Sequence, residues 1–110
     1  MQSNTLNTQQ KKSLRRIAHH LDPVIAVSER GLSEGIVGET ERALRDHELI
    51  KIKVFGIDRA ARDEIMTTLA AQTQAVVLQK IGKLAVLYRS NPHANPKLSN
   101  VARYLKNPNF

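Results

Sequence analysis

Three short stretches of this sequence carry side chains that could act on a ligand or a substrate. His19-His20 and His47-Glu48 offer imidazoles and a carboxylate, and Ser28-Glu29-Arg30-Gly31 combines a hydroxyl, a cation and a glycine. Imidazoles serve as metal ligands or general bases, whereas a glycine beside a cation suits a loop that approaches a phosphate closely. Metal binding, catalysis and anion binding are therefore the three kinds of chemistry to weigh.

The histidines do not form a pattern typical of a metal centre or a catalytic group. On a helix the neighbours His19 and His20 diverge by about 100°, so they cannot both face one ion. His47, with Glu48, stands where a helix is expected to end, and a cationic imidazole there stabilises the negative helix pole. The sequence has no cysteine and no glycine-rich nucleotide fingerprint. We therefore expect no enzyme activity, no metal and no cofactor.

The stretch Ser28–Gly31 lies between a predicted strand and a predicted helix. The first amides of a helix are unpaired and its positive pole points outward, so phosphate can bind there. Arg30 adds a long cation, and Gly31 lets the backbone come close to a ligand. The alternative is an ordinary turn with one glycine, and these residues alone do not decide between the two.

The net charge of +7 is concentrated towards the two ends of the chain. Residues 1–20 carry four cations and no acid, residues 90–110 carry three cations and no acid, and the charges between them balance. This distribution favours a polyanionic partner, because phosphates that are neutralised release condensed counterions. A solvated basic surface without such a partner is the alternative. The four N-terminal cations are Lys11, Lys12, Arg15 and Arg16.

The length of 110 residues, with 41% hydrophobic and 25% charged side chains, is typical of one globular domain. No apolar run approaches the roughly 18 residues that a membrane span needs, and the first ten residues lack the apolar core of a signal peptide. We therefore expect a cytoplasmic protein. A monomer is also expected, because one core uses all of the apolar stripes.

Apolar periodicity predicts helices that alternate with strands. In 50–55 the alternation is strict, so Ile50, Ile52 and Val54 face a core while Lys51 and Lys53 face the other way. Gly82-Lys83 fits a hairpin turn. The predicted elements are a helix capped by Asn7 or Thr8 and reaching Leu21, a strand over 24–27, a helix capped by Ser33 and reaching His47, a strand over 50–55, a helix capped by Asp58 and including Leu69, and strands over 75–81 and 84–88.

This order, α-β-α-β-α-β-β, predicts an α/β fold with right-handed crossovers, whose helices share one face of the sheet and leave the other face open. After Arg89, asparagine–proline pairs interrupt any period. We therefore expect a flexible N-terminus over residues 1–5, a domain over residues 6–89 and a basic flexible tail over residues 90–110. One helical turn from Val101 to Leu105, in contact with a partner, is the alternative for the tail.

Four ordered blocks of the sequence resemble one known family. In this order they are similar to the CRM domain, the chloroplast RNA splicing and ribosome maturation module, in its stand-alone bacterial YhbY-like form. The blocks are Leu14-Arg15-Arg16-Ile17-Ala18-His19-His20-Leu21 with Pro23-Val24, Gly31-Leu32-Ser33-Glu34-Gly35, His47-Glu48-Leu49-Ile50-Lys51-Ile52-Lys53, and Ile81-Gly82-Lys83 with Val86-Leu87-Tyr88-Arg89.

The resemblance implies a mixed four-stranded sheet with three helices on one face, similar to the C-terminal domain of a bacterial translation initiation factor. It also implies RNA binding: bacterial members associate with precursors of the large ribosomal subunit, and plant relatives assist group II intron splicing. A Gly-x-x-Gly loop, like that of KH domains, is thought to contact the RNA backbone in this family. Here the loop is Ser28-Glu29-Arg30-Gly31, in which a serine replaces the first glycine.

The sequence therefore predicts a protein that binds structured ribosomal RNA in large-subunit precursors and assists ribosome assembly. Only four aromatic side chains are present, so base stacking contributes little and binding should depend strongly on salt. Three alternatives remain: an adaptor with an acidic protein partner, an enzyme that acts on RNA through a histidine, and a duplex DNA binder. The expected RNA-binding residues are Ser28, Glu29, Arg30, Gly31, Lys11, Lys12, Arg15, Arg16, Lys51 and Lys53.

Overall fold

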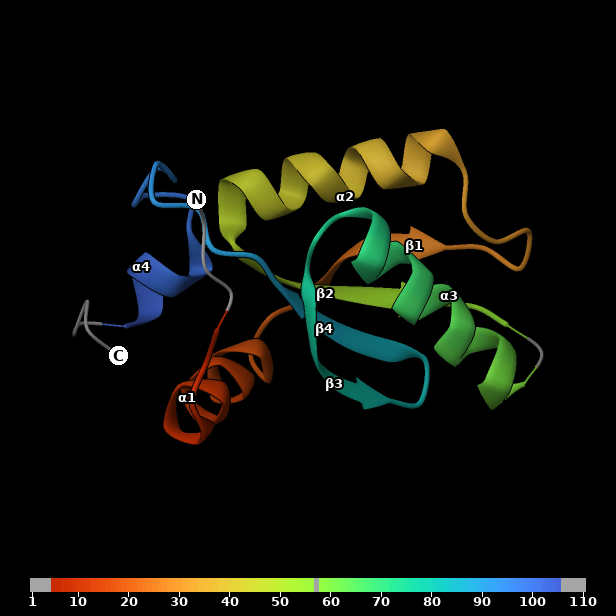
Figure 1. Cartoon of the computed structure of the whole chain (residues 1–110), viewed down its shortest axis with the longest axis horizontal. Coiled ribbons are helices and arrows are strands. Elements are labelled where there is room, and N and C mark those ends of the chain that lie inside the picture. Colours follow the sequence, from red (N-terminus) through yellow and green to blue (C-terminus); the bar gives the residue numbers. More distant parts are fainter. Residues whose placement is uncertain (1–4, 57, 106–110) are drawn as a thin grey trace.

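The computed structural model describes residues 5–56 and 58–105, in which eight elements follow one another (Figure 1). The helices are α1 (Thr8–Ala18), α2 (Glu34–His47), α3 (Arg59–Gln72) and α4 (Asn100–Tyr104). The strands are β1 (Pro23–Val27), β2 (Leu49–Val54), β3 (Val76–Ile81) and β4 (Leu84–Tyr88). The predicted order up to Tyr88 is confirmed, and α4 lies where a helical turn was the alternative to a flexible tail. Most of the predicted flexible N-terminus, residues 1–4, lies outside the described residues.

Side-chain caps explain where the first three helices begin. The Asn7 side chain accepts a hydrogen bond from the Gln10 amide at 2.8 Å, and the Gln10 side chain accepts one from the Asn7 amide at 2.9 Å. Ser33 and Asp58 each accept a hydrogen bond from the amide three residues further on. Each cap satisfies an amide that has no partner within the helix. The predicted capping positions are therefore confirmed, with Asn7 as the first.

The strands form one mixed sheet in the order β1-β2-β4-β3. β1 runs parallel to β2, whereas β4 runs antiparallel to both β2 and β3. Gly82, at φ +56°, adopts the left-handed conformation that the tight turn between β3 and β4 requires. The alternation predicted for β2 is confirmed, since Ile50, Ile52 and Val54 are buried in the core beneath α2 and α3.

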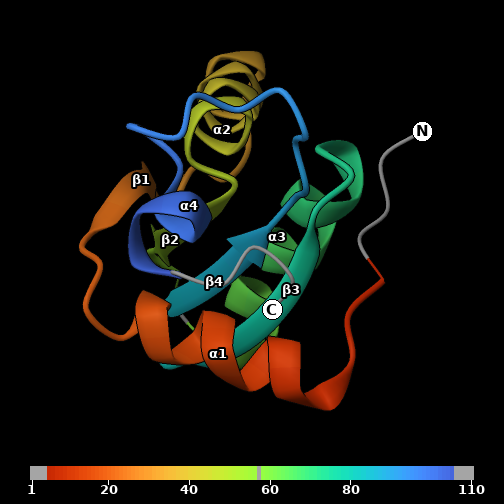
Figure 2. The ribbon, with the colours of Figure 1, turned by 90° about the vertical axis from the view of Figure 1, so that its left-hand side faces the viewer.

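Helices cover both faces of this sheet, which corrects the expectation of three helices on one face (Figure 2). α2 and α3 pack on the face that carries Ile52 and Leu87. α1 packs on the opposite face, where Leu14 and Ala18 share a second core with Val86. The handedness rule applies to α2 and α3, because each connects two parallel strands of the sheet. α1 precedes the first strand and connects no strands, so the rule does not determine its face.

Residues 90–105, for which the sequence predicts flexibility, contact the folded domain at two places. The Asn91 side chain and the Leu98 carbonyl bond to the end of α2, whereas α4 packs on the α1 side of the sheet. Glu48 is the main anchor: its carboxylate accepts hydrogen bonds from the Asn91 amide at 2.9 Å and from the Ser99 hydroxyl at 2.8 Å. The Asn100 side chain donates to the Leu49 carbonyl at 2.7 Å. Val101 of α4 is buried in the second core, so this turn contacts the protein itself. Residues 106–110 of the predicted tail lie outside the described part of the chain.

α1 and α4 cover only part of their sheet face. On the uncovered part, Val24 is 53% exposed and Ile81 is 59% exposed, although each lies in a strand. Lys51 and Lys53 also lie on this face, because they alternate with the buried residues of β2. The predicted open face is therefore only partly present, because α1 and α4 cover the rest of it.

Candidate nucleic-acid interface

Lys51 and Lys53 project from β2 onto the uncovered part of the sheet. In the antiparallel pairing with β4, Lys51 lies opposite Val86 and Lys53 lies opposite Leu84. Both lysines are half-buried. Long cationic side chains suit such a place, because their stems cover apolar surface while their charges stay hydrated. The structure therefore brings two of the predicted site residues together on one face.

Phe55, directly after β2, has two ammonium groups over its ring. Lys53 Nζ lies 5.1 Å from the ring centroid, and Lys83 Nζ, from the β3–β4 turn, lies 5.5 Å from it. Such a contact contributes about 0.5–1 kcal/mol at an exposed site. Lys83 and Phe55 were not among the predicted site residues, because their proximity depends on the hairpin register. The sequence pattern that indicates them is the lysine in the predicted Gly82-Lys83 turn, together with the aromatic residue at the end of a strand.

The loop Ser28–Gly31 lies next to Phe55, whose amide donates to the last carbonyl of β1 at 2.8 Å. It is a tight turn: the Gly31 amide donates to the Ser28 carbonyl at 2.9 Å, and Gly31 has φ +86°. The Ser28 hydroxyl accepts a hydrogen bond from the Arg30 amide at 3.3 Å. The Ser28 hydroxyl therefore occupies the backbone amide of Arg30 within the loop.

The side chains of this loop are turned outward. Ser28, Glu29 and Arg30 are all exposed. Within the described ranges, Glu29 and Arg30 form no ion pair with each other. The pairing of β1 with β2 places Ala26 opposite Lys53, two residues before the loop begins. Lys53 therefore lies between Lys51 on the sheet and the loop Ser28–Gly31.

α1 borders the same sheet face and presents most of its cations to solvent. Lys11, Lys12 and Arg16 are exposed. Arg15 is half-buried, and its Nη1 donates to the Leu78 carbonyl of the edge strand β3 at 3.4 Å. Arg15 thus helps to hold α1 on the sheet, whereas the other three cations are accessible to a partner.

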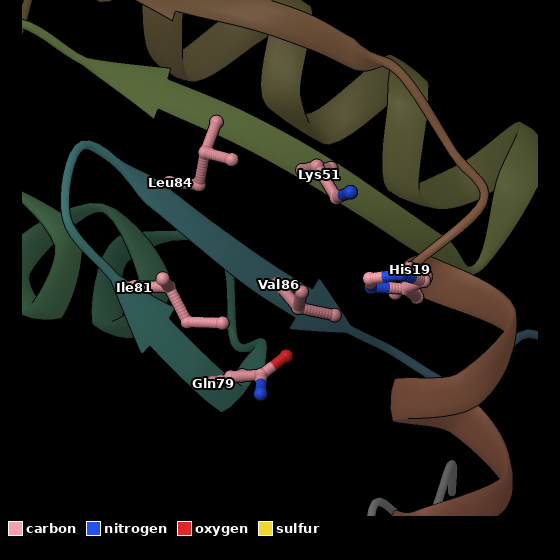
Figure 3. A pocket seen from close by; sticks show the side chains of 7 residues that line it. His19, Lys51, Gln79, Ile81, Leu84 and Val86 are labelled. Atoms are coloured by element: carbon pink, nitrogen blue, oxygen red, sulfur yellow. The ribbon is translucent and has the colours of Figure 1, made fainter.

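A cavity of about 260 Å³ lies between the end of α1 and the β3–β4 hairpin (Figure 3). In Figure 3, Lys51 and His19 stand on one side of Val86, and Gln79 stands on the other side. The cavity combines an apolar floor with three polar side chains and no carboxylate among its lining residues. These residues are Ala18, His19, Lys51, Gln79, Ile81, Leu84 and Val86.

Carboxylates do not neutralise this face through ion pairs. Across residues 5–56 and 58–105, the ion pairs join Arg45 to Asp46 and Arg89 to Glu41, and neither pair includes a cation of the uncovered sheet. The positive potential of Lys51, Lys53 and Lys83 is therefore available to an anionic partner.

The histidines make local contacts. His19 and His20 pack edge to face, with their ring centroids 5.5 Å apart, and His47 Nδ1 lies 2.8 Å from the Leu98 carbonyl. Because a carbonyl only accepts, Nδ1 of His47 carries the proton of this hydrogen bond. In the part of the chain that the structure describes, no three His, Asp or Glu side chains gather as metal ligands would. None of the described helices is both long and apolar enough to cross a membrane.

Comparison with known proteins places this fold in a family. The family model of the CRS1 / YhbY (CRM) domain matches residues 6–89. A protein of Pseudomonas aeruginosa named "Probable RNA-binding protein PA4753" is 48% identical over 99 residues, which cover 90% of this chain and 95% of that protein. A protein of Haemophilus influenzae named "RNA-binding protein" is 45% identical over 94 residues, which cover 86% of this chain and 95% of that protein.

A solved structure has the same fold. The solution structure of the hypothetical protein SAV1595 from Staphylococcus aureus superimposes with a TM-score of 0.72 at 30% sequence identity. The match covers 83% of this chain and 95% of that one. The α/β class and the mixed four-stranded sheet are confirmed by this agreement. With a family model that spans most of its length and relatives this similar, the chain belongs to the CRS1 / YhbY (CRM) domain family.

Proposed function

We propose that this chain binds ribosomal RNA in precursors of the large ribosomal subunit and assists their assembly in the cytoplasm, without catalysing a reaction. The observation that carries the proposal is a row of three lysines, namely Lys51 and Lys53 on the uncovered sheet face and Lys83 in the adjoining β3–β4 turn. None of them is ion-paired with a carboxylate of the described ranges. The names of the Pseudomonas and Haemophilus relatives support RNA as the partner.

The lysine row is the centre of the proposed contact surface, and its neighbours extend the surface in two directions. On one side, Lys11, Lys12 and Arg16 of α1 add cations that reach solvent. At the other end, the turn Ser28–Gly31 continues from the strand that pairs with Lys53. Lysines and arginines on such a surface bind phosphates, which position the RNA but do not read its sequence. We therefore propose recognition of a folded RNA mainly by its backbone.

The proposal is tested by sedimentation of the tagged protein from cell lysate through a sucrose gradient. Gradients are run at low and at high salt, each with and without ribonuclease, so that an RNA partner can be distinguished from a protein partner. The expected result is migration with large-subunit precursors at low salt and release by salt or by ribonuclease, because counterion release weakens phosphate contacts as the salt concentration rises.

Two outcomes contradict the proposal. A protein that stays at the top of every gradient does not bind ribosomal precursors. A protein that keeps a partner after ribonuclease treatment, and loses it in salt, is an adaptor for an acidic protein instead.

A further inference from the structure

The cavity between α1 and the β3–β4 hairpin differs from the phosphate-binding surface around it. Its floor consists of aliphatic side chains, among them Leu84, Val86 and the largely exposed Ile81. Cavities that bind drug-sized molecules measure about 300–1,000 Å³. At about 260 Å³, this cavity suits a single small planar group, and neither a nucleic-acid duplex nor a folded peptide fits inside it.

The polar groups of the cavity stand where a planar heterocycle needs them. Gln79 carries an amide, which can both donate and accept hydrogen bonds, on the β3 side. His19 stands on the opposite side and packs edge to face against His20. Proteins recognise unpaired RNA bases by stacking them on aromatic rings, including histidine, and by hydrogen bonds to their edges.

Charge decides between the possible occupants. Lys51 lies at the cavity wall beside His19, Lys53 follows on the same strand face, and no carboxylate is among the lining residues. An apolar group that is covalently linked to an anion therefore fits better than a neutral or cationic group. A nucleotide has this composition, because its flat base is joined to a phosphate.

We propose that this cavity receives one unpaired nucleobase of the bound RNA. The base stacks against His19 over the aliphatic floor, Gln79 bonds to its edge, and Lys51 holds the adjoining phosphate. This inference rests on the proposed RNA binding and adds to it that the preferred RNA carries a bulged or looped-out nucleotide.

The test compares three fluorescein-labelled hairpin RNAs that share one stem. One stem is fully paired, one carries a single bulged adenosine, and one carries an abasic site at the bulge. The abasic RNA keeps the distorted backbone and lacks the base. We expect the wild-type protein to bind the bulged RNA about tenfold more tightly than the other two, a preference of the size that stacking of one base contributes.

The variants His19→Ala and Gln79→Ala should lose this preference while their affinity for the paired stem stays unchanged. His93→Ala and Gln9→Ala are matched controls, because both residues are exposed and neither lines the cavity. Thermal unfolding shows whether each variant remains folded. Equal binding of the three RNAs by wild-type protein overturns the base-binding inference and leaves RNA binding intact. Failure to bind any of them overturns the proposed function itself.

Discussion

Arg89 Nη1 lies 2.6 Å from Glu41 Oε2, so the residue after β4 is tied to α2. The same nitrogen donates to the Thr73 carbonyl, at the end of α3, at 3.0 Å. Only 13% of the Arg89 side chain is exposed, whereas 43% of the Glu41 side chain is, so the contacts are partly buried. One side chain thus joins a strand to both helices on the face opposite the lysine row.

Arg89→Met should lower the free energy of unfolding by about 2 kcal/mol, because it leaves a half-buried carboxylate and a carbonyl without their charged donor. Urea denaturation of both proteins measures this loss. Arg45→Met is the matched control, since Arg45 is 61% exposed in its pair with Asp46 and such pairs contribute less than about 1 kcal/mol. Equal losses in the two variants contradict the assigned role of Arg89.

Glu48→Ala should release the C-terminal segment, because the Asn91 amide and the Ser99 hydroxyl both donate to this carboxylate. The expected result is faster amide hydrogen exchange in residues 99–105, with little change in β2 and β4. Glu48 also has φ +60°, so Glu48→Gly relieves the backbone strain and still lacks the carboxylate. If Glu48→Gly restores the protection of residues 99–105, the carboxylate is not the anchor. Glu39→Ala, on the exposed side of α2, serves as the control.

Local patterns of the sequence predicted most of the fold. Asn7, Ser33 and Asp58 cap helices because their side chains reach amides three residues away, and such contacts are visible in a sequence window. The alternation in β2 identified both the buried residues and the lysine face. The side of the sheet occupied by α1 depends instead on packing against distant strands, for which neither periodicity nor crossover handedness gives a signal.

The other differences between the predictions and the structure have the same cause, which is contact between residues far apart in the chain. Ser99 binds Glu48, and Asn100 binds the Leu49 carbonyl, although about fifty positions separate each pair along the chain. A polar segment with asparagine–proline pairs therefore resembles a flexible tail until its partners are located. The cluster of Lys53, Phe55 and Lys83 likewise appears only when the hairpin register is known.

Because of Tyr88, the free energy of unfolding should depend on pH in the alkaline range. Burial raises the pKa of Tyr88 above its ordinary value of 10.0, Glu48 raises it further, and the hydrogen bond with Ser90 lowers it. Because the pKa of Tyr88 is higher in the folded state, the folded protein keeps the phenol proton at a pH where the unfolded chain has lost it. The stability of the folded state is therefore unaffected by this group below its ordinary pKa, and it falls as the pH rises from there through the folded pKa.

Tyr88→Phe removes this ionisation. The free energy of unfolding should therefore fall less steeply above about pH 10 in the variant than in the wild type. Urea denaturation of both proteins from neutral to alkaline pH compares the slopes, so the constant effect of the lost Ser90 hydrogen bond cancels. Parallel curves contradict the prediction.

The double variant Lys51→Gln/Lys53→Gln should bind a hairpin RNA about tenfold more weakly at moderate salt. Two lost phosphate contacts should also reduce the slope of log affinity against log salt by roughly 1.5. Fluorescence anisotropy over a salt series measures both quantities. The control Arg42→Gln/Lys97→Gln removes the same charge from exposed positions away from this sheet face and should alter the slope less. Identical slopes for the two double variants mean that net charge, and not the lysine row, determines binding.

Ser28→Gly should raise the affinity for RNA several-fold. The Ser28 hydroxyl accepts the Arg30 amide hydrogen at 3.3 Å, so its removal frees that amide for a phosphate, and glycine also allows a closer approach of the backbone. Ser28→Ala is the matched variant: it frees the amide but keeps the Cβ, so its gain in affinity should be smaller. Anisotropy titration with one hairpin RNA ranks the three proteins. A loss of affinity in both variants means that the hydroxyl itself contacts the RNA and that the serine is a direct ligand of the backbone.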